Sequence, residues 1–204
     1  MSEKSSIKPP KKEELIDMVK SRGFDSVEEF EFGEWLREAC ELGVASLATH
    51  HPAAIKLSDR FSIMAEKKLK TKTVMAEKFL LHPHEYTPDY RVVFNEGMLA
   101  RIGLAKNTII ASPQDQADFD FSVGLYYIDV KGGFSRFHDG KSFSINQKWV
   151  YDKYKIFINK IVPEDWFVKT WVPEFCKTTW KKGEIRDKWR GNLDKAAIKE
   201  RLKI

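Results

Sequence analysis

Two side chains that could act on a phosphate group lie close together near the middle of the chain. The stretch YYIDVKGG, residues 126–133, has the composition of a buried strand and carries Asp129 and Lys131 two positions apart. Because side chains alternate across a strand, both project from the same face. They could form an exposed ion pair of little energetic weight. Alternatively, Asp129 is a metal-binding carboxylate, and Lys131 handles a phosphate or an attacking water.

A second acidic candidate, Asp89, follows Pro88 at the start of a predicted strand, in the stretch EYTPDYRVVF. Proline lacks an N–H group and is tolerated at the first residue of a strand, so Pro88 would direct Asp89 along the sheet edge. Threonine, proline and aspartate are also common in turns, and a simple turn at residues 87–89 is the alternative interpretation.

A helix with an acidic first turn is predicted upstream, in FDSVEEFEFGEWLREACELG, residues 24–43. Ser26 is the expected N-cap, and Glu28 and Glu29 in the first turn suit the helix dipole. Gly43 is expected to end the helix. Apolar residues at helical spacing predict a core-facing side made of Phe32, Trp35, Leu36 and Ala39.

These three segments, taken in chain order, resemble the PD-(D/E)XK nuclease superfamily, and most closely its small phage-type and transposase-associated endonucleases. The strings that carry the resemblance are FDSVEE (residues 24–29), YTPDY (86–90) and IDVKG (128–132). The resemblance covers roughly residues 24–172. It implies an α/β fold with a mixed central β-sheet flanked by α-helices, the restriction-endonuclease-like core.

The resemblance also implies a metal-dependent DNA endonuclease that hydrolyses phosphodiester bonds. Mg²⁺ or Mn²⁺ would be bound by Asp89, Asp129, the Val130 carbonyl and Glu29, and Lys131 would position the attacking water. A branched-DNA or Holliday-junction resolvase of phage or mobile-element type is the specific expectation. Such an enzyme acts at two sites, so a homodimer is also expected.

Further residues are predicted to contact DNA. Two glycines after the strand would admit a nucleic-acid backbone, and the spacing of Gln147 and Tyr151 resembles a Q-x-x-x-Y motif of exonuclease-like branches. Residues 177–204 carry ten Lys or Arg and four Asp or Glu, which leaves the rest of the chain near neutral. That tail is either a phosphate-backbone contact or a solubilising face. The candidate DNA contacts are Gly132, Gly133, Gln147, Lys148, Lys181, Lys182, Arg186 and Arg190.

The sequence departs from the family pattern in its spacing. Asp89 and Asp129 lie 40 positions apart, whereas the phage-type relatives join these strands by a short hairpin. An insertion near residues 95–122 would explain the gap. The rival hypothesis takes Asp118 or Asp120 as the metal-binding acid; the more specific YTPDY string favours Asp89. Glu29 is similarly preferred over the alternatives Glu28 and Glu34.

The expected domain organisation is a disordered segment (residues 1–12), a nuclease-like α/β domain (13–176) and a basic C-terminal extension (177–204). Residues 44–63 are expected to enter the sheet, 70–94 to hold strands broken at Pro83 and Pro88, and 165–174 to form another strand. Residues 144–161 have helical spacing, with Ser144 as the cap.

The 204 residues are 32% charged and 42% hydrophobic, with no membrane-length apolar run and no apolar segment typical of a secretory signal. Cys40 and Cys176 are interpreted as buried free thiols. These features predict a cytoplasmic protein, in the host cell if phage-encoded. The pairs His50–His51 and His82–His84 lack zinc-site spacing, so they are expected in exposed loops or grooves.

Two other kinds of protein are compatible with the sequence. One is a non-catalytic nucleic-acid-binding or accessory protein on the same fold, although the intact Asp-x-Lys pair argues against it. The other is a phage protein that binds a host protein, which only the aromatic-rich C-terminal part suggests.

Overall fold

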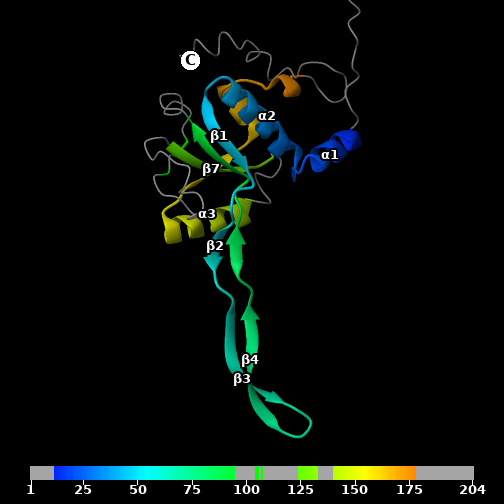
Figure 1. The fold of residues 1–204 in the computed structure, drawn as a ribbon, viewed down its shortest axis with the longest axis vertical. Helices are drawn as coiled ribbons and strands as arrows, with labels where there is room; N and C mark the ends of the chain where they lie inside the picture. Colours follow the sequence, from blue (N-terminus) through cyan, green and yellow to red (C-terminus); the bar gives the residue numbers. More distant parts are fainter. Residues whose placement is uncertain (1–11, 95–103, 106, 108–123, 133–139, 178–204) are drawn as a thin grey trace, which may run out of the picture.

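The computed structural model describes residues 12–94, 104–105, 107, 124–132 and 140–177, and it shows a mixed α/β body from which a long two-stranded arm projects (Figure 1). The helices are α1 (Lys12–Ser21), α2 (Val27–Glu41), α3 (Gly140–Tyr154), α4 (Pro163–Lys169) and the 3₁₀ turn η4 (Glu174–Cys176). The strands of the body are β1 (Ala45–His50), β6 (Tyr90–Phe94), β7 (Gly124–Val130) and β8 (Ile158–Ile161).

The body is built on a four-stranded sheet in the order β1-β6-β7-β8. Strands β1, β6 and β7 pair antiparallel, and β8 pairs parallel with β7. The expected mixed sheet flanked by helices is therefore confirmed. In the part of the chain that the structure describes, no helix is long and apolar enough to cross a membrane.

The two faces of the sheet bury different helices. On one face, Trp35 of α2 and Phe167 of α4 pack against Ile128 of β7. On the other face, Val150 of α3 packs in a second cluster with Tyr127 of β7. Because side chains alternate along β7, Asp129 shares the face of Tyr127 and lies on the α3 side of the sheet.

Helix α2 forms as the sequence predicts. The Ser26 side chain is the N-cap and accepts a hydrogen bond from the Glu29 N–H (3.1 Å). Gly43 follows the helix at φ 69°, a left-handed conformation that glycine adopts without a steric cost. The predicted core-facing residues Phe32, Trp35, Leu36 and Ala39 are all buried.

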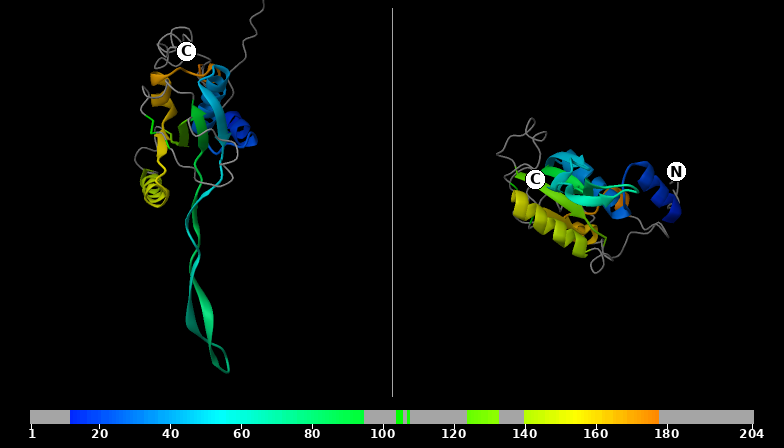
Figure 2. Two further views of the ribbon diagram at one scale, coloured as in Figure 1. Left: turned by 60° about the vertical axis from the view of Figure 1, so that its left-hand side comes forward. Right: turned by 90° about the horizontal axis from the view of Figure 1, so that it is seen from below.

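Between β1 and β6 the chain leaves the body as a two-stranded ribbon, residues 55–86, which we call the arm (Figures 1 and 2). At its base β2 (Ile55–Ser58) pairs with β5 (His84–Tyr86), and beyond them β3 (Phe61–Lys68) pairs with β4 (Thr73–Leu81). The expectation that residues 44–63 enter the main sheet is therefore wrong beyond His50. Both prolines do fall at breaks between strands, as predicted.

The base of the arm is fastened to α3. Lys153 Nζ donates hydrogen bonds to the carbonyls of Lys56 and Leu57, each at 3.1 Å, and the Tyr154 hydroxyl also donates to the Lys56 carbonyl. His84 Nε2 lies 2.9 Å from Asn146 Oδ1. These contacts fix the direction in which the arm leaves the body.

Three further expectations are wrong. Residues 165–174 do not form a strand: α4 begins at Pro163, with Glu164 and Asp165 in its first turn, where proline and acidic residues favour a helix start. Ser144 lies inside α3, which already begins at Gly140. Cys40 is exposed, on the solvent side of α2, whereas Cys176 is buried as expected.

Candidate active site

Asp89 and Asp129 meet at the carboxyl end of β7. The Val130 N–H donates a hydrogen bond to Asp89 Oδ2 (2.6 Å), which holds the Asp89 side chain against the end of the strand that carries Asp129. The backbone of Asp89 is held too, because its carbonyl accepts from the His51 N–H (2.9 Å). The fold therefore brings together two acids that lie 40 positions apart in the sequence.

Lys131 extends this pair of acids. Its Nζ lies 2.5 Å from Asp129 Oδ1, and its backbone N–H donates to the Ile161 carbonyl at 2.8 Å. The Tyr86 hydroxyl donates to the other carboxylate oxygen of Asp129 (2.5 Å). The side chain of Asp129 is only 5% exposed, so the Asp-x-Lys pair is a largely buried ion pair and not a solvated surface contact.

Glu29, in the first turn of α2, is the third acid of the site and is buried. Its Oε2 accepts from the Asp25 N–H (2.9 Å). Its Oε1 lies 2.6 Å from His50 Nε2 and 2.9 Å from His51 Nε2. The two imidazole rings stack, with their centroids 3.8 Å apart.

The residues of this site suit a divalent cation. Glu29, His50 and His51 present one ligand atom each within 4.8 Å of one another, and this group could hold a metal ion. Burial, and then the charge of Asp129, raise the pKa of the Asp89 carboxyl to about 7, although the Val130 N–H and Lys131 lower it; Glu29 adds to the increase. Buried carboxylates with like charges repel one another, and a divalent cation bound by their oxygens would neutralise that repulsion.

The raised pKa of Asp89 predicts a pH-dependent stability in metal-free protein. The folded state holds a proton on Asp89 up to about pH 7, whereas the unfolded chain releases it near pH 3.8. Stability should therefore fall as the pH rises through this interval, because the folded state binds more protons there. Asp89→Asn should remove the penalty, so that its gain over wild type grows from near zero at pH 4 to about 4 kcal/mol at pH 8.

Chemical denaturation in EDTA at several pH values measures this difference. Asp152→Asn on the exposed side of α3 is the matched control, because the Asp152 side chain is 90% exposed. A difference between Asp89→Asn and wild type that does not change with pH would contradict the prediction.

The structure distinguishes among the glutamates that the sequence left open. Glu34 is engaged with Arg37 on the same helix, at 3.2 Å. Glu28 lies beside Gly132, where an added Cβ would come within 2.8 Å of Glu28 Oε1. Of the three, Glu29 has its charge acting on Asp89. The room above Gly132 is thus partly taken by Glu28.

The two predicted DNA contacts on α3 differ: Gln147 is hydrogen-bonded to the sheet, and Lys148 is exposed. Gln147 Nε2 donates to the Ile158 carbonyl of β8 (2.6 Å), so Gln147 ties α3 to the sheet. Lys148 is exposed, and so is Tyr151, which lies under Lys155 Nζ. The other predicted DNA contacts outside the described part of the chain are Gly133, Lys181, Lys182, Arg186 and Arg190. The alternative metal-binding acids Asp118 and Asp120 also lie outside it, as does nearly all of the expected insertion at 95–122.

No protein-family model, curated protein sequence or solved structure matches this chain. The interpretation of the site therefore depends on its own chemistry.

The sequence did not predict that His50, His51 and Tyr86 belong to the site. His50 is the last residue of β1 and His51 follows it. Their spacing is typical of no metal motif, so only the fold brings them to Glu29. Tyr86 is the first residue of the YTPDY string, and that position was the one available signal. Burial and the neighbouring Asp129 raise the pKa of the Tyr86 hydroxyl, which keeps it protonated as a donor.

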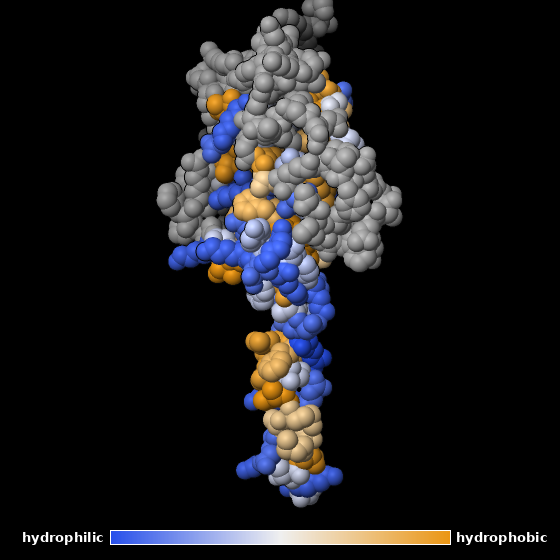
Figure 3. Space-filling model, turned by 90° about the vertical axis from the view of Figure 1, so that its left-hand side faces the viewer, coloured by the Kyte–Doolittle hydropathy of each residue, from blue (hydrophilic) through white to orange (hydrophobic). Residues whose placement is uncertain are grey.

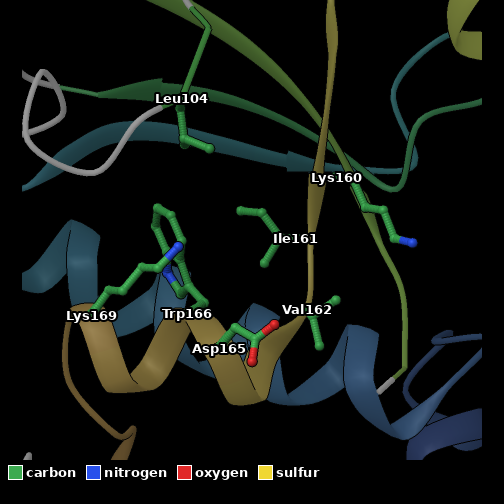
Figure 4. Close-up of a pocket in the computed structure, with 7 residues that line it drawn as sticks. All are labelled: Leu104, Lys160, Ile161, Val162, Asp165, Trp166 and Lys169. Carbon is green, nitrogen blue, oxygen red and sulfur yellow. The ribbon is translucent and has the colours of Figure 1, made fainter. Parts of the chain in front are cut away.

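A surface pocket lies apart from these acids, between the edge strand β8 and α4 (Figure 4). Trp166 and Lys169 come from α4, and Ile161 lies between them and Leu104. Lys160 borders the pocket, but its Nζ lies 6.0 Å from the centroid of the Phe143 ring on the α3 side. Glu29, Asp89 and Asp129 are not among the lining residues, so this pocket is not the candidate active site.

Proposed function

We propose that the protein is a metal-dependent nuclease with a restriction-endonuclease-like core of the PD-(D/E)XK type, which hydrolyses phosphodiester bonds in DNA. The observation that carries the proposal is the convergence of Asp89, Asp129 and Lys131 at one end of β7. Glu29 completes the acidic group from α2. An exposed ion pair on a plain strand would not bury Asp129 or bring Asp89 beside it.

In this proposal Asp89, Asp129, the Val130 carbonyl and Glu29 hold Mg²⁺ or Mn²⁺. The bound ion would lower the pKa of a water molecule and neutralise charge on the leaving oxygen. The two imidazoles beside Glu29 favour Mn²⁺ over Mg²⁺ at that position, because imidazole nitrogen binds transition ions better than Mg²⁺.

The other residues position these groups. The Tyr86 hydroxyl and the Lys131 ammonium each bind one oxygen of Asp129, which fixes the orientation of that carboxylate. The Val130 N–H does the same for Asp89. From its place beside Asp129, the Lys131 ammonium would position the attacking water or contact a phosphate oxygen.

A cleavage assay tests the proposal. Linear, nicked and four-way DNA are incubated with the full chain in Mg²⁺, in Mn²⁺ and in EDTA. We expect cleavage that requires a divalent ion, with the four-way junction as the preferred substrate if the protein is a branched-DNA resolvase of phage or mobile-element type. A homodimer is the expected form in that case.

DNA binding without cleavage of any substrate in either ion would favour the alternative, a non-catalytic nucleic-acid-binding protein on this fold. The basic tail, residues 177–204, is proposed as an additional phosphate contact under either function, because its excess of Lys and Arg is independent of the acidic site.

A further inference from the structure

The arm is long compared with its cross-section. Beyond its base, the arm consists of β3 and β4 alone. These two strands pair with each other and with no strand of the body. The 14 residues from Ile55 to Lys68, at about 3.3 Å per residue, give a reach of about 45 Å. Two-stranded ribbons are at best marginally stable alone in water, so a surface that covers the arm would stabilise it.

The tip of the arm is strongly basic. Residues 67–72, KKLKTK, hold four lysines in six residues, and all of residues 66–73 are exposed. The turn closes with a hydrogen bond from the Leu69 N–H to the Lys72 carbonyl (2.8 Å). Among the described residues, no acidic side chain forms an ion pair with the lysines of the tip.

The base of the arm lies in the candidate active site. Tyr86 pairs with Ile55 at the first rung of the ribbon, and its hydroxyl donates to Asp129. His51 and Asp89, which flank the arm on its two sides, are joined by a backbone hydrogen bond. The acidic site and the basic tip are therefore the two ends of one element, which α3 holds in a fixed direction.

We propose that the arm is a second DNA-binding element, whose tip lysines contact backbone phosphates about 13 base pairs from the scissile phosphate. The distance follows from the reach of about 45 Å and a rise of about 3.4 Å per base pair. This inference rests on the proposed function for its choice of partner, because the site at the base defines which polymer the tip would meet.

The side chains along the arm also suit duplex DNA. The register pairs Ile63 with Lys78, Ala65 with Ala76 and Lys67 with Val74, so one face of the ribbon combines aliphatic residues with two lysines. Figure 3 shows apolar and hydrophilic side chains in alternating bands along the arm. The major groove of B-DNA admits a two-stranded ribbon, and apolar side chains there contact thymine methyl groups.

The first test measures DNA affinity in EDTA, so that its result does not depend on cleavage. A tip variant, Lys68→Gln/Lys70→Gln/Lys72→Gln, is compared with wild type on duplexes of 8–24 base pairs at several salt concentrations. Wild type should gain affinity once the duplex exceeds about 13 base pairs, whereas the tip variant should not. The logarithmic salt slope of the tip variant should be shallower by about 2.7, because each lost phosphate contact removes about 0.9.

A control variant with the same change in net charge separates a local contact from a general charge effect. Its three lysines are exposed and lie on α1, after α3 and on α4: Lys20→Gln/Lys155→Gln/Lys169→Gln. This variant should keep the gain with duplex length and should change the salt slope by less than one. Equal effects of the two variants would overturn the proposal.

A second variant shortens the arm and tests whether the duplex length needed for tight binding shortens with it. Deleting Met64, Ala65, Ala76 and Glu77 removes two complete register pairs, which keeps the alternation of faces in the remaining strands. The tip then moves about 7 Å closer to the body. The duplex length at which affinity rises should fall by about two base pairs, with the tip lysines intact.

Two results would overturn the inference. One is an unchanged length threshold in the shortened arm. The other is a tip variant that binds DNA like wild type but changes the sedimentation coefficient, because the arm would then contact a second copy of the chain. A protein that shows the length threshold but never cleaves DNA would refute the nuclease function and leave the arm's role in DNA binding supported.

Discussion

Asp129→Asn is expected to lower the rate of metal-dependent DNA cleavage by at least about 10³-fold, which corresponds to about 4 kcal/mol of transition-state stabilisation. The substitution keeps the size of the side chain and an oxygen that can accept from Tyr86, but it removes a charge that a metal ion needs. It also removes the ionic partner of Lys131. Single-turnover cleavage with saturating enzyme measures the chemical step without the contribution of binding.

DNA affinity in EDTA should change by less than about threefold in Asp129→Asn, because the carboxylate is buried and repels the phosphate backbone only weakly. Asp152→Asn on α3 is again the matched control and should cleave at the wild-type rate. Cleavage by Asp129→Asn at the wild-type rate in Mg²⁺ would remove Asp129 from the site and, with it, the main support for the nuclease function.

Asp89→Ala should likewise abolish metal-dependent cleavage, whereas Asp118→Ala and Asp120→Ala should retain most of it. The reason is the position of Asp89, whose Oδ2 accepts from the Val130 N–H next to Asp129. An alanine there leaves that N–H without its acceptor and the cation with one fewer carboxylate. The three variants are compared by single-turnover rate and by binding of Mn²⁺, which electron paramagnetic resonance detects directly.

The opposite ranking is equally informative. If Asp118→Ala or Asp120→Ala abolished cleavage and Asp89→Ala did not, the metal-binding acid would come from the segment before β7. The hydrogen bond of Asp89 would then serve only to close the end of the sheet.

The sequence predicted those features that depend on neighbouring residues. The cap at Ser26, the buried face of α2 and the left-handed Gly43 each follow from a local pattern of a few residues. The Asp-x-Lys pair was predictable for the same reason, because the alternation of a strand places Asp129 and Lys131 on one face.

The features that the sequence did not predict depend on contacts between distant segments. Residues 61–81 alternate weakly and expose large apolar side chains on both strands, so their pattern does not distinguish a free ribbon from sheet strands. The partners of Glu29 are His50 and His51, more than 20 positions away, and no local signal connects them. Residues 165–174 were expected to form a strand, but the acidic first turn after Pro163 favoured the helix α4.

The attachment of the arm has a mechanical consequence. The arm is about 45 Å long. It joins the body where the His51 N–H donates a hydrogen bond to the Asp89 carbonyl. His51 there adopts a left-handed backbone conformation, φ 45°, which leaves this joint little conformational freedom. Ile55, Leu57 and Tyr86 at this base belong to the hydrophobic cluster under α3, and Tyr86 also donates to Asp129, so a sideways load on the tip would act on the core and on the acidic site together.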